Sequence, residues 1–189
     1  SPTSSSKTNV TNLVSSTGVV ATDTTGVGTA RELLAAAGYG GDKALFGFGY
    51  TYSSSPYERN MTNLVSNVGV VASDTTGVGS ARQRVAAAGY GGDKAIFGFG
   101  RTQNSPYQSN TTNLVSNAGV VASDTTGVGT ARTTPAADTT GVGVSRYSLA
   151  ATNYGGDKAI FAFGGHSSPK TNTNPYNGNS YTNNYYSDS

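Results

Sequence analysis

The chain of 189 residues has a formal net charge of +2, only 12% charged residues and no cysteine. Without cysteine there can be no disulfide and no thiolate nucleophile. The lysines and arginines form no basic stripe that could bind nucleic acid, and no apolar run comes near the ~20 residues that cross a bilayer. We therefore expect neither nucleic-acid binding nor membrane insertion. The 26 glycines and the scarcity of helix formers predict an all-β fold rich in turns.

Internal repeats organise the chain. The tetrapeptide Thr-Asn-Leu-Val recurs at steps of 51 and 50 residues, together with the box Asp-Thr-Thr-Gly-Val-Gly, which a 14-residue duplication near 124–143 repeats once more. Periods of this size are typical of propellers, solenoids or arrays. We therefore divide the chain into a polar arm, three repeat units and a tail rich in Asn, Ser and Tyr: residues 1–8, 9–59, 60–109, 110–165 and 166–189.

Four short strands are predicted within one unit, of which the second unit is the most regular. An Ala-rich strand at 84–90 and an aromatic strand at 94–100 flank a Gly-Gly-Asp turn, and a polar loop leads to 111–116 and 119–122, one long or two short strands. The Asp-Thr-Thr-Gly-Val-Gly box follows as a turn or edge strand. Alanine also favours helix, but the glycine-rich boxes leave only about eight residues between them, so we expect strand.

All six phenylalanines lie in the aromatic strands. Strict alternation along a strand places the two phenylalanines of one unit on the same face of its sheet. We therefore predict that they pack between neighbouring units as the structural core. They are Phe46, Phe48, Phe97, Phe99, Phe161 and Phe163.

The repeat domain, residues 9–165, resembles the kelch family of β-propeller blades. Lys43-Ala-Leu-Phe-Gly-Phe-Gly49 and its copies look like the second kelch strand, and Gly164-Gly165 is an intact terminal glycine pair, although the chain has no tryptophan. The repeats are also similar to Gly/Thr-rich kelch-like arrays of phage and environmental bacterial surface proteins. The resemblance implies a β-propeller-like fold with about three four-stranded blades of ~50 residues each.

The two ends of the repeat array are incomplete. If a blade begins at its Ala-rich strand, 31–80 and 81–130 form whole blades, whereas 146–165 supplies a first half and 11–28 a second half. Three blades lie below the usual ~4–8. We therefore expect the terminal half blades to be completed by exchange of N- and C-terminal strands, within one subunit or between subunits of a homo-oligomer or filament.

The sequence offers little for catalysis or for holding a metal. His166 is the only histidine, and we interpret it as a surface residue. The repeated aspartates of the turns and boxes suggest either calcium ligands or hydrogen-bond acceptors in turns, and we favour the second because each loop holds one carboxylate. We expect no enzyme activity, no cofactor and no metal.

Three further sets of repeated residues are candidates for binding or modification. Arginines follow the boxes and pair with the repeated aspartates or face anionic glycans; tyrosines in the long loops stack on sugars or cover sheet edges. Asparagines in Asn-X-Thr sequons are glycosylation sites or simply copied with the repeat. The residues are Arg31, Arg82, Arg132 and Arg146; Tyr50, Tyr52, Tyr57 and Tyr107; and Asn9, Asn60 and Asn110.

The leading hypothesis is a non-enzymatic structural protein, a subunit of an extracellular fibre or a virion appendage that assembles with itself. The alternative is a carbohydrate-binding adhesin or receptor-binding module at the cell or virion surface, which binds glycans through its loops. By composition, the tail 166–189 is expected to be disordered or draped over the surface, anchored by Tyr181, Tyr185 and Tyr186.

Overall fold

The structure is a computed structural model that describes residues 7–53, 55–104, 107–125, 150–162, 170–173 and 180–183. It is all-β, and the described residues contain no helix, as predicted. The strands are β1 (Ala35–Tyr39), β2 (Lys43–Gly47), β3 (Thr62–Val65), β4 (Ala86–Tyr90), β5 (Lys94–Gly98), β6 (Thr112–Val115), β7 (Ala150–Tyr154), β8 (Lys158–Ala162), β9 (Lys170–Thr173) and β10 (Ser180–Asn183).

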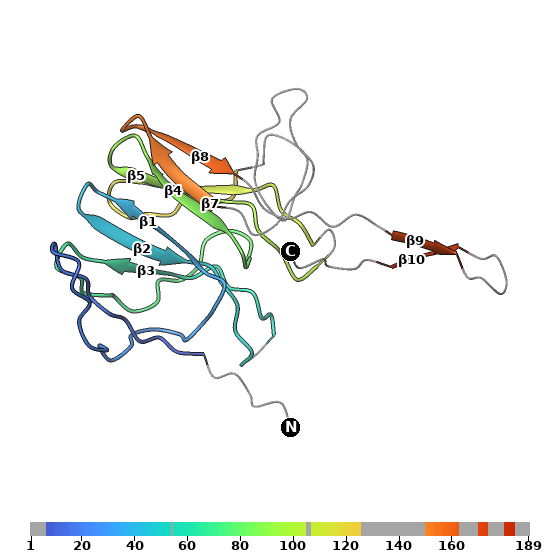
Figure 1. Cartoon of the computed structure of the whole chain (residues 1–189), viewed down its shortest axis with the longest axis horizontal. Helices are drawn as coiled ribbons and strands as arrows, with labels where there is room; N and C mark the ends of the chain where they lie inside the picture. The colour runs from blue at the N-terminus through green and yellow to red at the C-terminus, as the bar shows by residue number, and fades with distance from the viewer. Residues whose placement is uncertain are drawn as a thin grey trace.

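The strands form small antiparallel sheets (Figure 1). Two sheets have three strands, in the orders β1-β2-β3 and β4-β5-β6, and two are hairpins, β7-β8 and β9-β10. The two three-stranded sheets share one register: Gly47 lies opposite Thr62 in the first and Gly98 opposite Thr112 in the second. The alanine triplets are in β1 and β4, which confirms the prediction of strand over helix.

From here on a unit is counted from its Ala-rich strand, so the first is 31–80 and the second 81–130. Left-handed glycines make the tight turn between the first and second strands of each unit. Gly40 and Gly41 have φ of 61° and 81°, and their copies in the next two units repeat these values within 3°. This region of φ is open to glycine but costs other residues energy, so the Gly-Gly-Asp sequence dictates the β1-β2 turn and its copies.

A fourth extended segment follows β3 and β6. It is joined to β3 by the isolated bridges Thr62 to Thr75 and Val65 to Val71, and the same bridges recur between β6 and the segment that includes Val121. The predicted fourth strand is therefore present as a bridged segment, without a continuous ladder.

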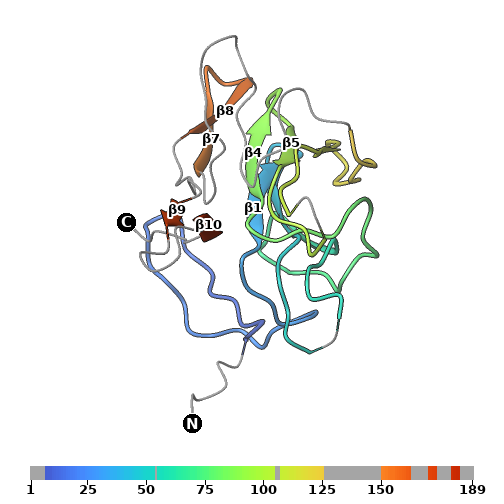
Figure 2. The same cartoon turned by 90° about the vertical axis from the view of Figure 1, so that its right-hand side faces the viewer.

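Neighbouring units lie side by side through their first strands, β1 against β4 and β4 against β7 (Figures 1 and 2). Equivalent turns are bonded to one another: the Gly40 N–H donates to the Asp93 carbonyl at 2.7 Å, and the Gly91 N–H donates to the Asp157 carbonyl at 2.8 Å. The core lies between β1–β3 and β4–β6. Its buried side chains are Tyr39, Leu45, Phe48, Val85, Ala95, Phe97 and Val115.

The prediction that both phenylalanines of a strand face the same neighbour is wrong. Phe48 has φ of 63°, so the strand kinks after Gly47 and the alternation is broken. The Phe48 ring meets the Phe97 ring of the next unit at a centroid distance of 5.1 Å, whereas Phe46 lines a cavity against the N-terminal segment. In the first unit the two phenylalanines thus face opposite neighbours, while Phe48, Phe97 and Phe99 are buried in the core, as predicted.

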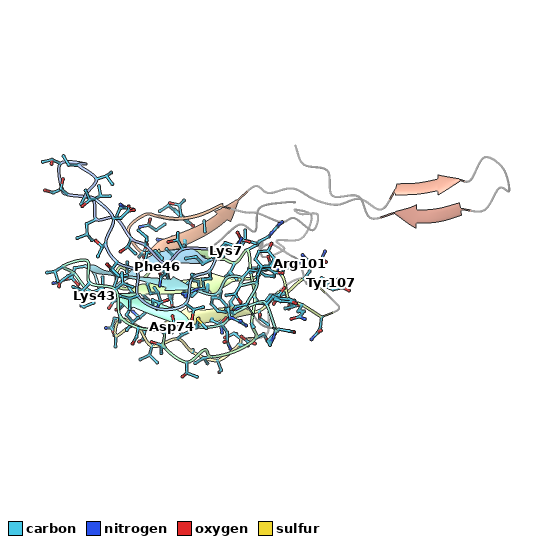
Figure 3. The ribbon with its side chains drawn as sticks, turned by 90° about the horizontal axis from the view of Figure 1, so that it is seen from below. Lys7, Lys43, Phe46, Asp74, Arg101 and Tyr107 are labelled. Atoms are coloured by element: carbon cyan, nitrogen blue, oxygen red, sulfur yellow. The ribbon has the colours of Figure 1, made fainter. Side chains whose placement is uncertain are left out.

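Part of the tail forms a hairpin, which differs from the expected disordered or surface-draped segment. β9 and β10 pair with each other and extend away from the other sheets (Figures 1 and 3). Tyr181 belongs to β10, whereas Tyr185 and Tyr186 lie outside the described residues.

Candidate assembly interface

A buried arginine just before the first strand of a unit contacts the third strand and the fourth segment of the same unit. Arg31 donates through Nε to the Phe48 carbonyl at 2.8 Å and through Nη2 to Asn63 Oδ1, and its Nη1 lies 3.5 Å from Asp74 Oδ1. Asn63 in turn donates to Asp74 Oδ1 at 2.9 Å. We call Arg31, Asn63 and Asp74 the arginine node.

The arginine node recurs in the second unit with Arg82, Asn113 and Asp124. Arg82 is fully buried and donates to Asn113 Oδ1 and, at 2.7 Å, to the Thr111 carbonyl. Burial lowers the pKa of Arg82 to about 10, an effect that Asp124 opposes, so the guanidinium is charged at neutral pH. Arg31 and Arg82 are both buried, so neither lies on a face that a glycan can reach. Of the two predicted roles, these arginines therefore have the first, an interaction with the repeated aspartates Asp74 and Asp124.

The aspartates of the arginine nodes also accept hydrogen bonds from the segment that precedes the first strand of each unit. Asp74 Oδ2 accepts from the Thr29 N–H at 2.9 Å and from the Thr29 hydroxyl at 2.6 Å, and Asp124 accepts from Ser80 at the same distances. Burial alone raises the pKa of Asp74, but the hydrogen bonds from Thr29 and Asn63 and the charge of Arg31 outweigh it and hold the pKa below its usual value.

The interface between the first and second units is apolar and tight. Phe97 is fully buried against Gly47, where an added Cβ would come 2.7 Å from the ring. The Arg82 guanidinium lies 4.7 Å from the centroid of the Phe48 ring, a cation–π contact within the usual range. The Gly49 N–H donates to the Arg82 carbonyl at 2.9 Å.

The hairpin formed by residues 11–24 has the same sequence pattern as 62–75, but among the described residues no first and second strand precede it. Its bridges, Thr11 to Thr24 and Val14 to Val20, are both internal. Asn12 donates to Asp23 Oδ1 at 2.8 Å, as Asn63 does to Asp74, but no arginine of the described residues joins them. The outer edge of Thr11–Val14 is therefore an incomplete copy of the interior arrangement.

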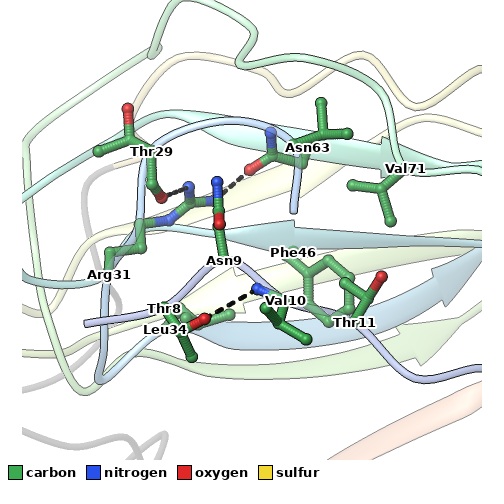
Figure 4. A pocket seen from close by; sticks show the side chains of 11 residues that line it. Thr8, Asn9, Val10, Thr11, Thr29, Arg31, Leu34, Phe46, Asn63 and Val71 are labelled. Carbon is green, nitrogen blue, oxygen red and sulfur yellow. Dashed lines mark hydrogen bonds between the residues drawn. The ribbon is translucent and has the colours of Figure 1, made fainter. Parts of the chain in front are cut away.

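A cavity of about 120 Å³ lies at this open end, between the N-terminal segment and the first unit (Figure 4). Phe46 and Arg31 line it from the first unit, and Asn9, Val10 and Thr11 line it from the N-terminal segment. Phe46 is only half-buried there, whereas its counterpart Phe97 is fully buried. The cavity thus marks the place where a preceding strand is missing.

At the opposite end, β8 has one free edge. β8 pairs with β7, and no further strand of the described residues pairs with it, although β2 and β5 each pair on both sides. An unpaired strand edge presents free N–H and carbonyl groups to any strand of matching sequence. Both ends of the array can therefore accept β-strand addition.

The loop tyrosines cluster at the end of the strands away from the Gly-Gly-Asp-Lys turns. Figure 3 shows Lys43 at one end of the sheets and Arg101 with Tyr107 at the other. Tyr50 meets Tyr52 and Tyr57 at centroid distances of 4.9 and 5.8 Å. Tyr52, 64% exposed, and Tyr107, 54% exposed, keep much of their surface open to solvent.

The sequon asparagines pack against the glycines of the next box. Asn9 Nδ2 donates to the Gly28 carbonyl and Asn60 Nδ2 to the Gly79 carbonyl, each at 2.7 Å. Asn110 is half-buried at the equivalent position. Glycosylation of these asparagines stays a prediction.

The remaining candidates divide into turn residues and residues that the structure does not describe. Asp42 accepts from Lys43 at 3.1 Å and from Asn67 at 3.0 Å, which is the turn role. In the described part of the chain, no group of three or more His, Cys, Asp and Glu side chains can hold a metal ion. Asp138, Arg132, Arg146, Phe163 and His166 lie outside the described residues, as does the side chain of Phe161.

The node asparagines Asn63 and Asn113 were not among the candidates from sequence. Each is almost fully buried and bonds to both the arginine and the aspartate of its node. Their recurrence in every Thr-Asn-Leu-Val tetrapeptide was the available signal, because an invariant polar residue inside an apolar strand needs buried partners.

Neither a protein-family model nor any curated protein matches this chain. Within the residues that the structure describes, no helix is long and apolar enough to cross a membrane.

Proposed function

We propose that the chain is a non-enzymatic structural protein that assembles with itself as a subunit of an extracellular fibre or a virion appendage. The observation that carries this proposal is the open edge of Thr11–Val14, whose sequence is paired on both sides where it recurs in β3 and β6. Two strand edges that no described strand pairs with, those of β8 and Thr11–Val14, are suited to join further copies. The low share of charged residues, the lack of cysteine and the single histidine support the same non-enzymatic function.

The finer fold we propose is an array of kelch-like blades. Each complete unit is a meander of three strands and a bridged fourth segment, and the first strands of successive units lie side by side, as the inner strands of propeller blades do. The three Gly-Gly-Asp turns line one cavity of about 270 Å³, to which Tyr39, Tyr90 and Asn153 contribute. Turns that converge on a common cavity are expected at one mouth of a propeller channel.

Negative-stain microscopy with a truncated variant tests the proposed function. The full chain is expected to give rings or filaments, and removal of residues 1–28 is expected to leave single particles, because the accepting hairpin is gone. A full chain that stays monomeric at high concentration would contradict the proposal.

A second candidate function, glycan binding, is favoured by a polar cavity between the long loops. The cavity, about 430 Å³, is lined by Glu58, Gln103, Asn104 and Gln108 among others. Glu58 is 5% exposed; its Oε1 accepts from Gln83, whereas its Oε2 is buried and has no hydrogen-bond partner. The amide side chains of Gln103, Asn104 and Gln108 in this lining are suitable hydrogen-bond partners for sugar hydroxyls.

A glycan array tests the second candidate. Selective binding that is lost in Glu58→Gln and in Tyr107→Ala, but kept in Tyr154→Ala at an exposed position away from these loops, is the expected result. An array with no selective signal would contradict it.

A further inference from the structure

We propose that β8 of one copy pairs antiparallel with Thr11–Val14 of a second copy. The register places Ala162 opposite Thr11, Phe161 opposite Asn12, Ile160 opposite Leu13 and Ala159 opposite Val14. This inference rests on the proposed self-assembly and names the two edges that meet. Together, β7 and β8 of one copy and the hairpin 11–24 of the other complete one unit.

The register comes from the two complete units of the same chain. β2 pairs with β3 and β5 pairs with β6 at equivalent positions, from Gly47 opposite Thr62 to Ala44 opposite Val65 in the first unit. β8 repeats the sequence of β5 except for its last residue, and Thr11–Val14 is identical to β3 and β6. The two complete units thus show the pairing of second and third strands that we propose between copies.

Side-chain exposure measures what is missing at the accepting edge. Val14 is 63% exposed, whereas the same valine in β6, Val115, is fully buried. Asn12 is exposed, whereas Asn63 and Asn113 are almost fully buried. The asparagine is buried in both complete units, and the valine is half-buried in β3 and fully buried in β6, so both are expected to lose exposure when the second strand is supplied.

The polar groups at this edge match those that bind an arginine in the two complete units. Asn63 Oδ1 and Asn113 Oδ1 accept from Arg31 and Arg82, which stand four residues before β1 and β4. The hairpin 11–24 presents the same pair, Asn12 and Asp23. In the sequence, Arg146 stands four residues before β7, the offset of the other two arginines.

The cavity under Phe46 fits the same partner. In the second unit, Phe97 covers Gly47 of the preceding β2, and the equivalent place beneath Phe46 is the cavity of about 120 Å³. β8 brings Ala162 to the position of Gly47, one methyl group more than the glycine. The half-buried Phe46 therefore has to shift, and Ala162→Gly is expected to tighten the contact.

We choose a second copy as the partner because β8 and Thr11–Val14 are not paired with each other within one chain. β7 packs on β4, whereas the hairpin 11–24 lies near β3 (Figure 1). Closure of one copy on itself would make a ring of three units, fewer than the usual ~4–8.

Engineered cysteines test the register, since the chain has no cysteine of its own. Val14→Cys and Ala159→Cys are made in separate proteins, mixed and oxidised. A covalent dimer is expected in the mixture and not in either protein alone. The matched control pairs Val14→Cys with Ile160→Cys, which stands one position away on the opposite face of the strand, and the yield of its dimer is expected to be several-fold lower.

The outcomes separate the inference from the function on which it rests. Oligomers that form without the Val14 to Ala159 cross-link would overturn the register and leave self-assembly standing. A fast-migrating monomer from the double variant in one chain would show closure within a copy and overturn the choice of partner. A purely monomeric protein would overturn both. In the Ala162→Gly background, a dissociation constant that does not fall would also count against the register.

Discussion

The hairpins at 11–24 and 62–75 have nearly the same sequence and the same backbone, yet the first strand of 62–75 is paired with β2 and that of 11–24 has no described strand on its outer edge. Gly18 and Gly69 both have φ of 80°, and the Ser15 and Ser66 N–H groups donate across their turns at 2.9 Å in both. Local sequence therefore determines the hairpin. Its burial depends on whether β2 or a copy of it lies alongside.

The largest effect that follows from this comparison concerns the two equivalent phenylalanines. Phe97→Ala is expected to lower the free energy of unfolding by about 3–5 kcal/mol, because it empties a fully buried site. Phe46→Ala is expected to cost clearly less, since Phe46 is half-buried at the open end. Urea denaturation of monomeric protein measures both, and equal losses would contradict the contrast.

The next effect concerns the glycine under Phe97. Gly47→Ala is expected to cost about 1–3 kcal/mol, because the new Cβ would stand 2.7 Å from the ring. Gly38→Ala is the control, since its Cβ would meet only an ordinary contact at 3.5 Å. Thermal unfolding of both variants distinguishes this contact from a general cost of removing strand glycines.

The arginine node allows the same comparison for a carboxylate. Asp74→Ala is expected to cost about 1–3 kcal/mol, because it removes an acceptor of Asn63 and Thr29 and the counter-charge of buried Arg31. Asp23→Ala, at the exposed hairpin, is expected to have little effect on unfolding of the monomer. A large loss at Asp23 in dilute monomer would mean that the two hairpins are equally enclosed.

The smallest effect is a dependence on pH. Asp74 and Asp124 have folded pKa values below their usual value, so the stability they contribute is fully present above the ordinary aspartate pKa of about 3.9 and is lost as the pH falls through the folded value. Asp124→Asn is expected to flatten the loss of stability in acid. Denaturation midpoints between neutral pH and the acid limit measure it, and an unchanged slope would contradict the role of this carboxylate.

The sequence was sufficient for the period, the turns and the aromatic strands, because each follows from local chemistry. It was insufficient at Phe48, where Gly-Phe-Gly permits a left-handed residue that the simple alternation rule does not anticipate. It also missed Asn63, because burial of a polar side chain depends on a partner, Arg31, that is distant in the sequence. The hairpin of β9 and β10 was missed because Asn and Ser carry no strand pattern.

The bonds from Gly40 to Asp93 and from Gly91 to Asp157 join equivalent atoms of successive units, so each unit is turned by a similar angle relative to the one before it. If copies join through a completed unit, the same angle continues across the joint. A constant angle either returns to its start after a whole number of copies or winds on as a helix. Two copies would bring four complete units and two composite ones. Whether such an assembly closes or winds on is then set by the backbone angle between units, whereas how far it grows depends on protein concentration.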